Sequence, residues 1–277
     1  MAETVFYFDF LGFSAMSLGD GAAAVDVLSD LAAVLQSKAI SQQVQRWRHR
    51  YALSDSVFLT HPDPVEALKL GAELVQNLVL YRKADPILVR GAFSYGEVHH
   101  LHGIFLAQPD GNLAGEAVVA AVRMEQTEHL KGPRIFIGDD LKRAIEQQDR
   151  LLAQWLLRPT TLAGIWEVLW LLPTHPDQFG AVETFVENLC TTATMMLQAH
   201  GGDATFGSHY REFALLAGRS IERLKQFAEW GMVKPPPVLP FNQFFSRREI
   251  VKICNDTTGL PDDFVARILD LARSMER

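Results

Sequence analysis

The sequence has few cysteines and no excess of positive charge. Cys190 and Cys254 are its two thiols in 277 residues, which excludes a disulfide framework and predicts a reducing, cytoplasmic setting. The formal net charge is -7. This charge argues against nucleic acid as a partner, because nonspecific binding depends on contacts of Lys and Arg with phosphates. The short basic stretch RWRHR at 46–50 is the one local exception.

The chain also lacks a long uninterrupted apolar run. Its most apolar later stretch, 151–172, contains Arg158, Pro159 and Glu167, so we expect no membrane span and no membrane partner. The start, Met-Ala-Glu-Thr, runs directly into an apolar segment and does not resemble a signal peptide. With 48% hydrophobic and 21% charged residues, the composition is that of a soluble globular protein.

Apolar periodicity predicts strands that alternate with helices, an order typical of an α/β sandwich. We expect a strand at 5–11, a helix within 22–39, a hairpin at 47–60, a helix from Pro64 to 81, a strand and hairpin at 87–100, a helix from near Gly115, a strand at 134–138 with a helix capped by Asp139 or Asp140, and a last strand at 165–172.

The composition changes after Pro173, and we predict a division there into residues 1–173 and residues 174–277. The second part is expected to be a helical extension of unknown role, with long helices at 177–199 and 207–230. The segment KPPPVLP after them predicts a stiff polyproline linker. Two shorter helices are expected beyond it, from near Arg247 and from Pro261.

One residue of the first strand, VFYFDFL, is out of place. Asp9 carries a carboxylate in an apolar strand, where an ionised group is costly unless it is paired or coordinated. The turn that follows offers the backbone N–H groups of Gly12, Phe13 and Ser14, which are suited to anionic oxygens. Sites for Mg²⁺ or Mn²⁺ combine one or two carboxylates with substrate phosphates. Asp55, at the predicted hairpin turn in YALSDSVF, is the candidate second carboxylate.

Four segments, in this order, resemble the motifs of the class III nucleotidyl cyclases. FDFLGFSAMS is similar to their F-x-D-[IL]-x-G-F-[ST], and YALSDSVF to the segment that holds their second metal aspartate. LVRGAFSYGEV is similar to R-[VI]-G-I-x-[ST]-G-x-V, and GEAVVAAVRME to G-x-x-V-N-x-A-x-R-M-E. The resemblance spans roughly residues 5 to 172. It implies a ferredoxin-type α+β core and a catalytic domain at 1–173.

The resemblance also implies a role for individual residues. Asp9 and Asp55 would bind two divalent ions, Mn²⁺ or Mg²⁺, with help from the Phe10 carbonyl. Arg90 would bind the triphosphate, to which a planar guanidinium is suited. Arg123 would stabilise the charge that develops on the α-phosphate during attack by the ribose 3′-oxygen. In this family the sites are composite and lie between two identical subunits, which implies a homodimer.

Several positions depart from the purine-cyclase pattern. Tyr51 stands where those enzymes have a base-reading Lys or Glu, and Asn112 falls near their second base-reading position. Val119 replaces the Asn that positions the ribose. No clear counterpart of the late triphosphate Lys is present, and Arg158 is the candidate replacement.

A bulky aromatic at position 51 shortens the base pocket and favours a one-ring base. Together with FDFLGFS and RGAFSYGE, it resembles the pyrimidine cyclases of bacterial Pycsar antiphage systems. That resemblance implies conversion of UTP to cyclic UMP, a second messenger that activates a separate effector. Cyclic CMP made from CTP, a purine cyclase with unusual base readers, and a degenerate homologue that binds nucleotide without catalysis remain alternatives.

Each candidate residue has an ordinary structural alternative. These are an N-cap or edge residue for Asp9, a turn residue for Asp55 and for Asn112, a surface ion pair for Arg90, a solvent-facing position for Arg123, and a half-buried strand aromatic for Tyr51. His99, His100 and His102 suggest zinc, but neighbouring strand residues point to opposite faces. We therefore expect these histidines to form a solvated strand end.

Overall fold

A computed structural model of the chain describes residues 2–13, 18–19, 21–81, 88–101, 112–127, 132–178, 182–203 and 207–233. Its strands are β1 (Ala2–Phe10), β2 (His49–Leu53), β3 (Ser56–His61), β4 (Val89–Glu97), β5 (His99–Leu101), β6 (Asn112–Ala114), β7 (Ile135–Gly138), β8 (Leu157–Pro159) and β9 (Ile165–Val168). Its helices are α2 (Gly21–Gln36), α3 (Lys38–Gln45), α4 (Pro64–Tyr81), α5 (Glu116–Glu125), α6 (Asp139–Gln148), α7 (Arg150–Leu156), α8 (Val182–His200) and α9 (Gly207–Glu229), with a short 3-10 turn η1 (Pro176–Gln178).

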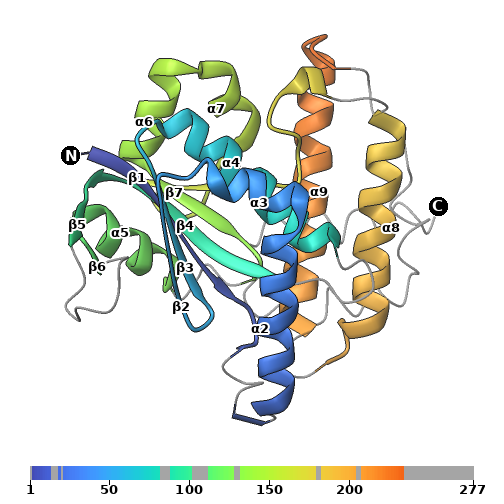
Figure 1. The fold of residues 1–277 in the computed structure, drawn as a ribbon. Coiled ribbons are helices and arrows are strands. Elements are labelled where there is room, and N and C mark those ends of the chain that lie inside the picture. Colours follow the sequence, from blue (N-terminus) through green and yellow to red (C-terminus); the bar gives the residue numbers. More distant parts are fainter. Residues whose placement is uncertain are drawn as a thin grey trace.

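Seven strands form one mixed sheet in the order β2-β3-β1-β4-β7-β9-β8 (Figure 1). The first four strands in this order are antiparallel neighbours, and α4 connects β3 to β4. The order 2-3-1-4 with two crossover helices is the ferredoxin-type arrangement. The predicted α/β fold is therefore confirmed.

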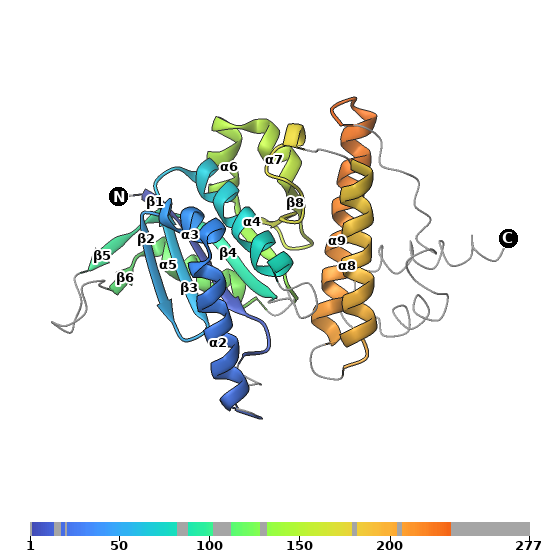
Figure 2. The ribbon, with the colours of Figure 1, turned by 45° about the vertical axis from the view of Figure 1, so that its right-hand side comes forward.

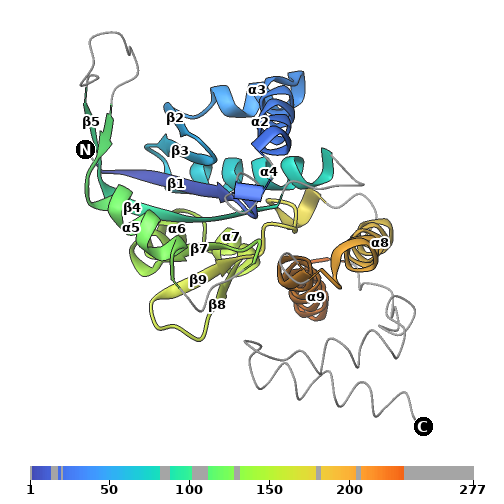
Figure 3. The same ribbon diagram turned by 90° about the horizontal axis from the view of Figure 1, so that it is seen from below.

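The two faces of the sheet have different partners because side chains alternate along β1. Phe6, Phe8 and Phe10 point into the main hydrophobic core, to which α4 contributes. Val5 and Tyr7 point to the other face, where they pack on Ala117 and Ala121 of α5. Figure 3 shows α2, α3 and α4 on one side of the sheet and α5 on the other. Asp9 shares the α5 face with Val5 and Tyr7.

β1 and β4 approach each other closely at one glycine. A Cβ added at Gly91 would lie 2.4 Å from the Tyr7 carbonyl oxygen, a distance that real Cβ atoms do not show. The pairing of β1 with β4, which places Asp9 opposite Arg90, thus requires the glycine of the RGAF segment.

Three sequence predictions are corrected by the structure, and two elements were missed. The helix expected within 22–39 breaks at Ser37 into α2 and α3. Gly138, and not Asp139 or Asp140, is the N-cap of α6, because β7 continues up to it. The strand expected at 165–172 ends at Val168, because residues 169–172 form a turn in which the Leu172 N–H donates to the Leu169 carbonyl at 2.9 Å. The short elements α7 and β8 were not expected.

α8 and α9 lie side by side at one end of the molecule, and the β5–β6 ribbon lies at the other (Figures 1 and 2). Arg219 of α9 pairs with the fully buried Glu167 of β9 at 3.0 Å, and Arg134 pairs with the same carboxylate at 2.7 Å. The division into residues 1–173 and 174–277 stays a prediction. The polyproline linker, the two last helices and Cys254 lie outside the described residues.

Among the described residues, no helix is both long enough and apolar enough to cross a membrane. Cys190 of α8 is a free thiol.

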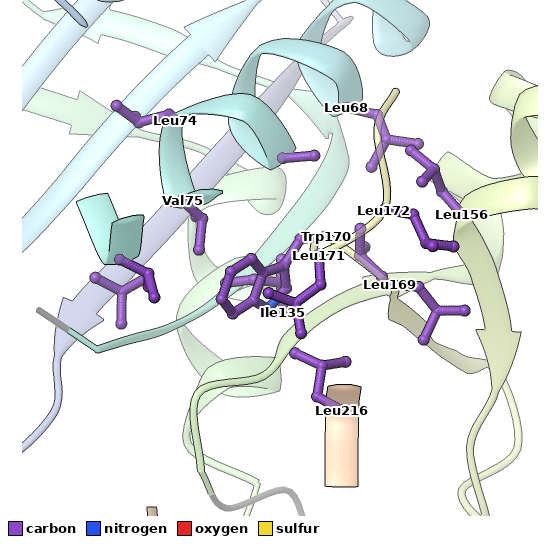
Figure 4. Close-up of a cluster of buried hydrophobic side chains, with 14 of the residues drawn as sticks. Leu68, Leu74, Val75, Ile135, Leu156, Leu169, Trp170, Leu171, Leu172 and Leu216 are labelled. Carbon is purple, nitrogen blue, oxygen red and sulfur yellow. The ribbon is translucent and has the colours of Figure 1, made fainter. Parts of the chain in front are cut away.

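Trp170 is at the centre of the buried cluster drawn in Figure 4, close to Leu171 and Ile135. Its side chain is fully buried, and the indole N–H donates to the Pro133 carbonyl at 3.1 Å. Trp170→Ala should lower the free energy of unfolding by about 3–5 kcal/mol, because it leaves a large cavity and an unpaired carbonyl. Urea unfolding followed by circular dichroism measures this loss.

The matched control is Trp230→Ala, since Trp230 is 59% exposed. That change should cost less than about 1 kcal/mol. Equal effects of the two substitutions would contradict the assignment of Trp170 to the core.

Candidate active site

Asp9 lies near the end of β1, in the middle strand of three. The register places Ser56 of β3 opposite it on one side and Arg90 of β4 on the other. Asp55 directly precedes Ser56 in the β2–β3 turn, where Ser54 adopts a φ of 57°. The two carboxyl groups of Asp9 and Asp55 lie within hydrogen-bonding reach of each other. Two carboxylates 46 residues apart in sequence thus share one site.

The electrostatics of this pair are unfavourable in the absence of a cation. Burial raises the pKa of Asp9 to about 7, and the negative charges of Asp55 and Glu125 add to the increase, while Arg90 opposes it. The Ser56 hydroxyl donates to Asp9 Oδ1 at 3.4 Å, and Tyr7 contacts the same hydroxyl at 3.2 Å. These weak contacts do not compensate for two adjacent negative charges.

The donor set fits a hard divalent cation. Carboxylate oxygens are the ligands that Mg²⁺ and Mn²⁺ prefer, and no thiol or imidazole of the described residues is among the contacts of Asp9. Within the described residues there is no cluster of three or more His, Cys, Asp or Glu side chains able to hold a metal. The remaining ligands would therefore come from backbone carbonyls, water or substrate.

The turn that follows β1 is described as far as Phe13. The Phe10 side chain is buried on the core face, so only its backbone carbonyl remains available to the Asp9 site. Gly12 has a φ of 85°, a conformation that favours glycine. Phe13 packs its ring into the core, while Ser14 lies outside the described residues. Anion binding by this turn stays a prediction.

Arg90 forms an ion pair with Glu125, in which its Nε contacts the Glu125 carboxylate. Glu125 ends α5, and its side chain is only 2% exposed. Burial raises the pKa of Glu125, and Arg90 opposes that shift. This ion pair joins α5 to the strand that borders Asp9. Glu125 was missed as a site residue, although it is the last residue of the GEAVVAAVRME segment and falls on the buried stripe of α5.

Arg123 and Val119 lie on the exposed side of α5. They are four residues apart and so share one face of the helix. Val119 is 48% exposed, and Arg123 is exposed as well. Glu125, two residues after Arg123, points to the opposite side, toward Arg90. The structure therefore brings Arg90, but not Arg123, next to Asp9 of the same chain.

Tyr51 lies on β2 opposite Phe58, on the same sheet face as Tyr7 and Asp9. Its hydroxyl contacts His100 Nδ1 at 3.1 Å, and His100 Nε2 contacts Glu3 Oε2 at 3.2 Å. The prediction of a solvated strand end is thus wrong for His100, whose side chain is 25% exposed, and fits His99 at 54%. The two rings point to opposite faces, as expected, and His102 lies outside the described residues.

Asn112 begins β6 and is exposed, opposite Leu101 in the β5–β6 ribbon. Its register places it on the other face of the ribbon from His100, which contacts Tyr51. Arg158 lies on the edge strand β8, four strands from β1, and is 3.6 Å from Glu167. Neither residue is brought to the Asp9 pair within one chain, and their roles remain predictions.

No protein-family model matches the sequence, and no curated protein matches it. Several solved structures are similar to part of the chain. The guanylyl cyclase domain of the RhoGC fusion protein from Blastocladiella emersonii is 20% identical, covering 61% of this chain and 96% of that one, with a TM-score of 0.48. The adenylyl cyclase CyaB from P. aeruginosa is 18% identical, covering 60% and 93%, with a TM-score of 0.43. An adenylate cyclase from Trypanosoma brucei is 12% identical, covering 65% and 91%, with a TM-score of 0.44.

Proposed function

We propose that the chain is a pyrimidine nucleotide cyclase that converts UTP to 3′,5′-cyclic UMP and diphosphate. The observation that carries this proposal is the pairing of Asp9 with Asp55 on one sheet face, next to Arg90. The product would be a second messenger in antiphage defence, read by a separate effector.

Asp9 and Asp55 would hold two Mn²⁺ or Mg²⁺ ions, with the Phe10 carbonyl as a further ligand. When bound, the ions would supply the positive charge that acidifies the ribose 3′-hydroxyl and neutralises the phosphates. Placing two partly buried carboxylates together costs stability in the free protein, and this cost is consistent with a site built for cations.

Arg90 would bind the triphosphate beside the carboxylate pair. Glu125 engages its Nε, which fixes the plane of the guanidinium and leaves its four terminal N–H donors for phosphate oxygens. A fixed planar donor set costs less entropy on binding than a freely rotating one. Glu125 is therefore a positioning residue for Arg90.

Arg123 would act on the site of the partner subunit. It is exposed and turned away from Asp9 of its own chain, so a second copy must bring its Arg123 to the α-phosphate. There it would stabilise the negative charge that grows as the 3′-oxygen–phosphorus bond forms and the bond to diphosphate breaks. The proposed enzyme is thus a homodimer with composite sites.

The experiment that tests the proposed function is incubation of the purified chain with each of the four NTPs in Mn²⁺ or Mg²⁺. We expect UTP to give a product with the mass and chromatographic position of 3′,5′-cyclic UMP. A preference for CTP would select cyclic CMP as the product. If none of the four NTPs is converted, the cyclase proposal fails and a degenerate nucleotide-binding homologue remains.

Tyr51→Ala tests the assignment of the base pocket. We expect the ratio of kcat/KM between pyrimidine and purine triphosphates to fall by about 10-fold or more, because the ring that shortens the pocket is removed. The Mn²⁺ concentration for half-maximal rate should not change, since Tyr51 is not one of the proposed metal ligands. An unchanged selectivity would contradict the role of Tyr51.

A further inference from the structure

A line of polar side chains runs from Tyr51 into the sheet. The Tyr51 hydroxyl contacts His100 Nδ1 at 3.1 Å, and His100 Nε2 contacts Glu3 Oε2 at 3.2 Å. Glu3 is 1% exposed. Its other oxygen, Oε1, accepts from Arg48 Nη1 at 2.8 Å. Glu3 and Asp9 are six residues apart on β1, so the Glu3 end of this line is roughly 20 Å from the carboxylate pair.

The chemistry of Arg48 and Glu3 fixes the direction of the two hydrogen bonds that Glu3 makes. Arg48 can only donate, and the Glu3 carboxylate can only accept. His100 must therefore carry its proton on Nε2 to donate to Glu3. In the neutral imidazole Nδ1 then has a lone pair and accepts from the Tyr51 hydroxyl. His49 lies against His100 with ring centroids 3.7 Å apart.

We infer that Glu3 and His100 are positioning residues that turn the Tyr51 hydroxyl proton away from the nucleobase, so that Tyr51 reads the base as a hydrogen-bond acceptor. This inference rests on the proposed function, because it deepens the role of Tyr51 in the base pocket. The ring atom N3 carries a proton in uracil and a lone pair in cytosine. An acceptor at position 51 therefore matches N3–H of uracil and opposes N3 of cytosine.

The isosteric substitution Glu3→Gln should reverse the direction of the hydrogen bonds from residue 3 through His100 to Tyr51. In Glu3→Gln the amide oxygen stays with Arg48, because Arg48 has only donors, and the amide NH₂ then faces His100 Nε2. His100 must accept there and move its proton to Nδ1, from which it donates to the Tyr51 oxygen. The Tyr51 hydroxyl then turns its own proton outward and becomes a donor, which matches N3 of cytosine.

The test is kcat/KM for UTP and for CTP in the wild type and in Glu3→Gln. We expect the ratio of kcat/KM for UTP to that for CTP to fall by about 10-fold or more. In the variant, uracil loses its matching hydrogen bond and cytosine gains one. The matched control is Glu97→Gln, because Glu97 makes a similar contact with His99, at 3.3 Å, on the exposed surface. That variant should keep the wild-type ratio.

A second comparison shows whether Glu3 acts through the hydroxyl of Tyr51. In a Tyr51→Phe background the same Glu3→Gln change should leave the ratio of UTP to CTP unaltered. A merely structural role of the buried Glu3 would persist without the hydroxyl. An unchanged ratio in Glu3→Gln alone, a shift toward UTP, or an equal shift in the Tyr51→Phe background would each overturn the inference.

A readout independent of turnover separates this inference from the proposed function. ¹⁵N NMR of the histidine side chains, with His100 assigned by His100→Gln, should show the proton on Nε2 in the wild type and on Nδ1 in Glu3→Gln. If the wild type cyclises no NTP, the proposed function fails, and binding of non-reactive UTP and CTP analogues gives the ratio instead. A proton on Nδ1 of His100 in the wild type would overturn the inference in either case.

Discussion

Asp9→Asn should abolish cyclisation of UTP and leave a folded protein. The substitution removes one of two carboxylates proposed to hold the divalent ions, so the loss in kcat should be on the order of 10³-fold. Product formation in excess Mn²⁺ measures it. The matched control is Asp26→Asn on the exposed side of α2, which should keep wild-type activity. Retention of more than about a tenth of the rate by Asp9→Asn would contradict the metal role.

The same variant should be more stable than the wild type at neutral pH without added metal. The pKa of Asp9 is about 7 in the folded protein, against an ordinary value of 3.8, because of burial and the neighbouring charge of Asp55. A carboxyl with a raised pKa binds its proton more tightly when folded, so the wild type loses stability as the pH rises from about 4 to about 7. Asn cannot ionise and escapes this loss.

The pH profile therefore separates a site defect from a folding defect. Between pH 3 and 4 the two proteins should unfold at similar urea concentrations, and the advantage of Asp9→Asn should grow up to about pH 7. A variant that is less stable throughout would show that Asp9 contributes to the fold. Loss of activity could then not be assigned to metal binding.

The position of the Asp9–Asp55 pair could be predicted from the sequence because its two parts are local. Asp9 breaks an apolar strand, and Asp55 sits in a two-residue turn between apolar segments. Strand alternation and the hairpin place both carboxyls at strand ends, and the structure adds the register, in which Ser56 lies opposite Asp9. The roles of both residues stay proposals, but their juxtaposition is a fact of the fold.

The line from Tyr51 to Glu3 could not be predicted, because its members are distant in sequence. Glu3 and His100 are 97 residues apart, and Arg48, which precedes β2, reaches Glu3 of β1 across β3. Nothing in the local pattern separates His100 from the exposed His99. Only the position of the β5–β6 ribbon relative to β2 makes one of them a partner of Tyr51.

The ends of elements were also hard to predict where tertiary contacts override local preference. Leu169 to Leu172 continue the apolar pattern of β9, yet the carbonyls of Trp170 and Leu172 both accept from Gln76 of α4 at 2.6 Å. These contacts, 94 and 96 residues apart in sequence, join the turn that follows Val168 to α4. A strand assignment from periodicity alone cannot include them.

A homodimer of Arg123→Ala should be nearly inactive. A mixed dimer of one Arg123→Ala subunit and one Asp9→Asn subunit should regain activity. Loss of a group that stabilises transition-state charge costs about 10²–10³-fold in kcat. Arg123 is exposed on α5, so its removal should leave the unfolding transition unchanged. In a mixed dimer, one site would combine the intact Asp9 of one subunit with the intact Arg123 of the other.

Complementation is the decisive measurement because a site within one chain cannot show it. Co-expression of the two variants with different affinity tags, and purification through both tags in sequence, isolates the mixed dimer. That dimer should recover about half of the wild-type rate, since one of its two sites is intact. If it stays as inactive as its parents while Arg123→Ala alone is inactive, Arg123 does not act in the partner's site. Glu125 turns one side of α5 toward Arg90, and Arg123 lies on the other side, so recovery is the outcome expected if Arg123 acts in the site of the partner subunit.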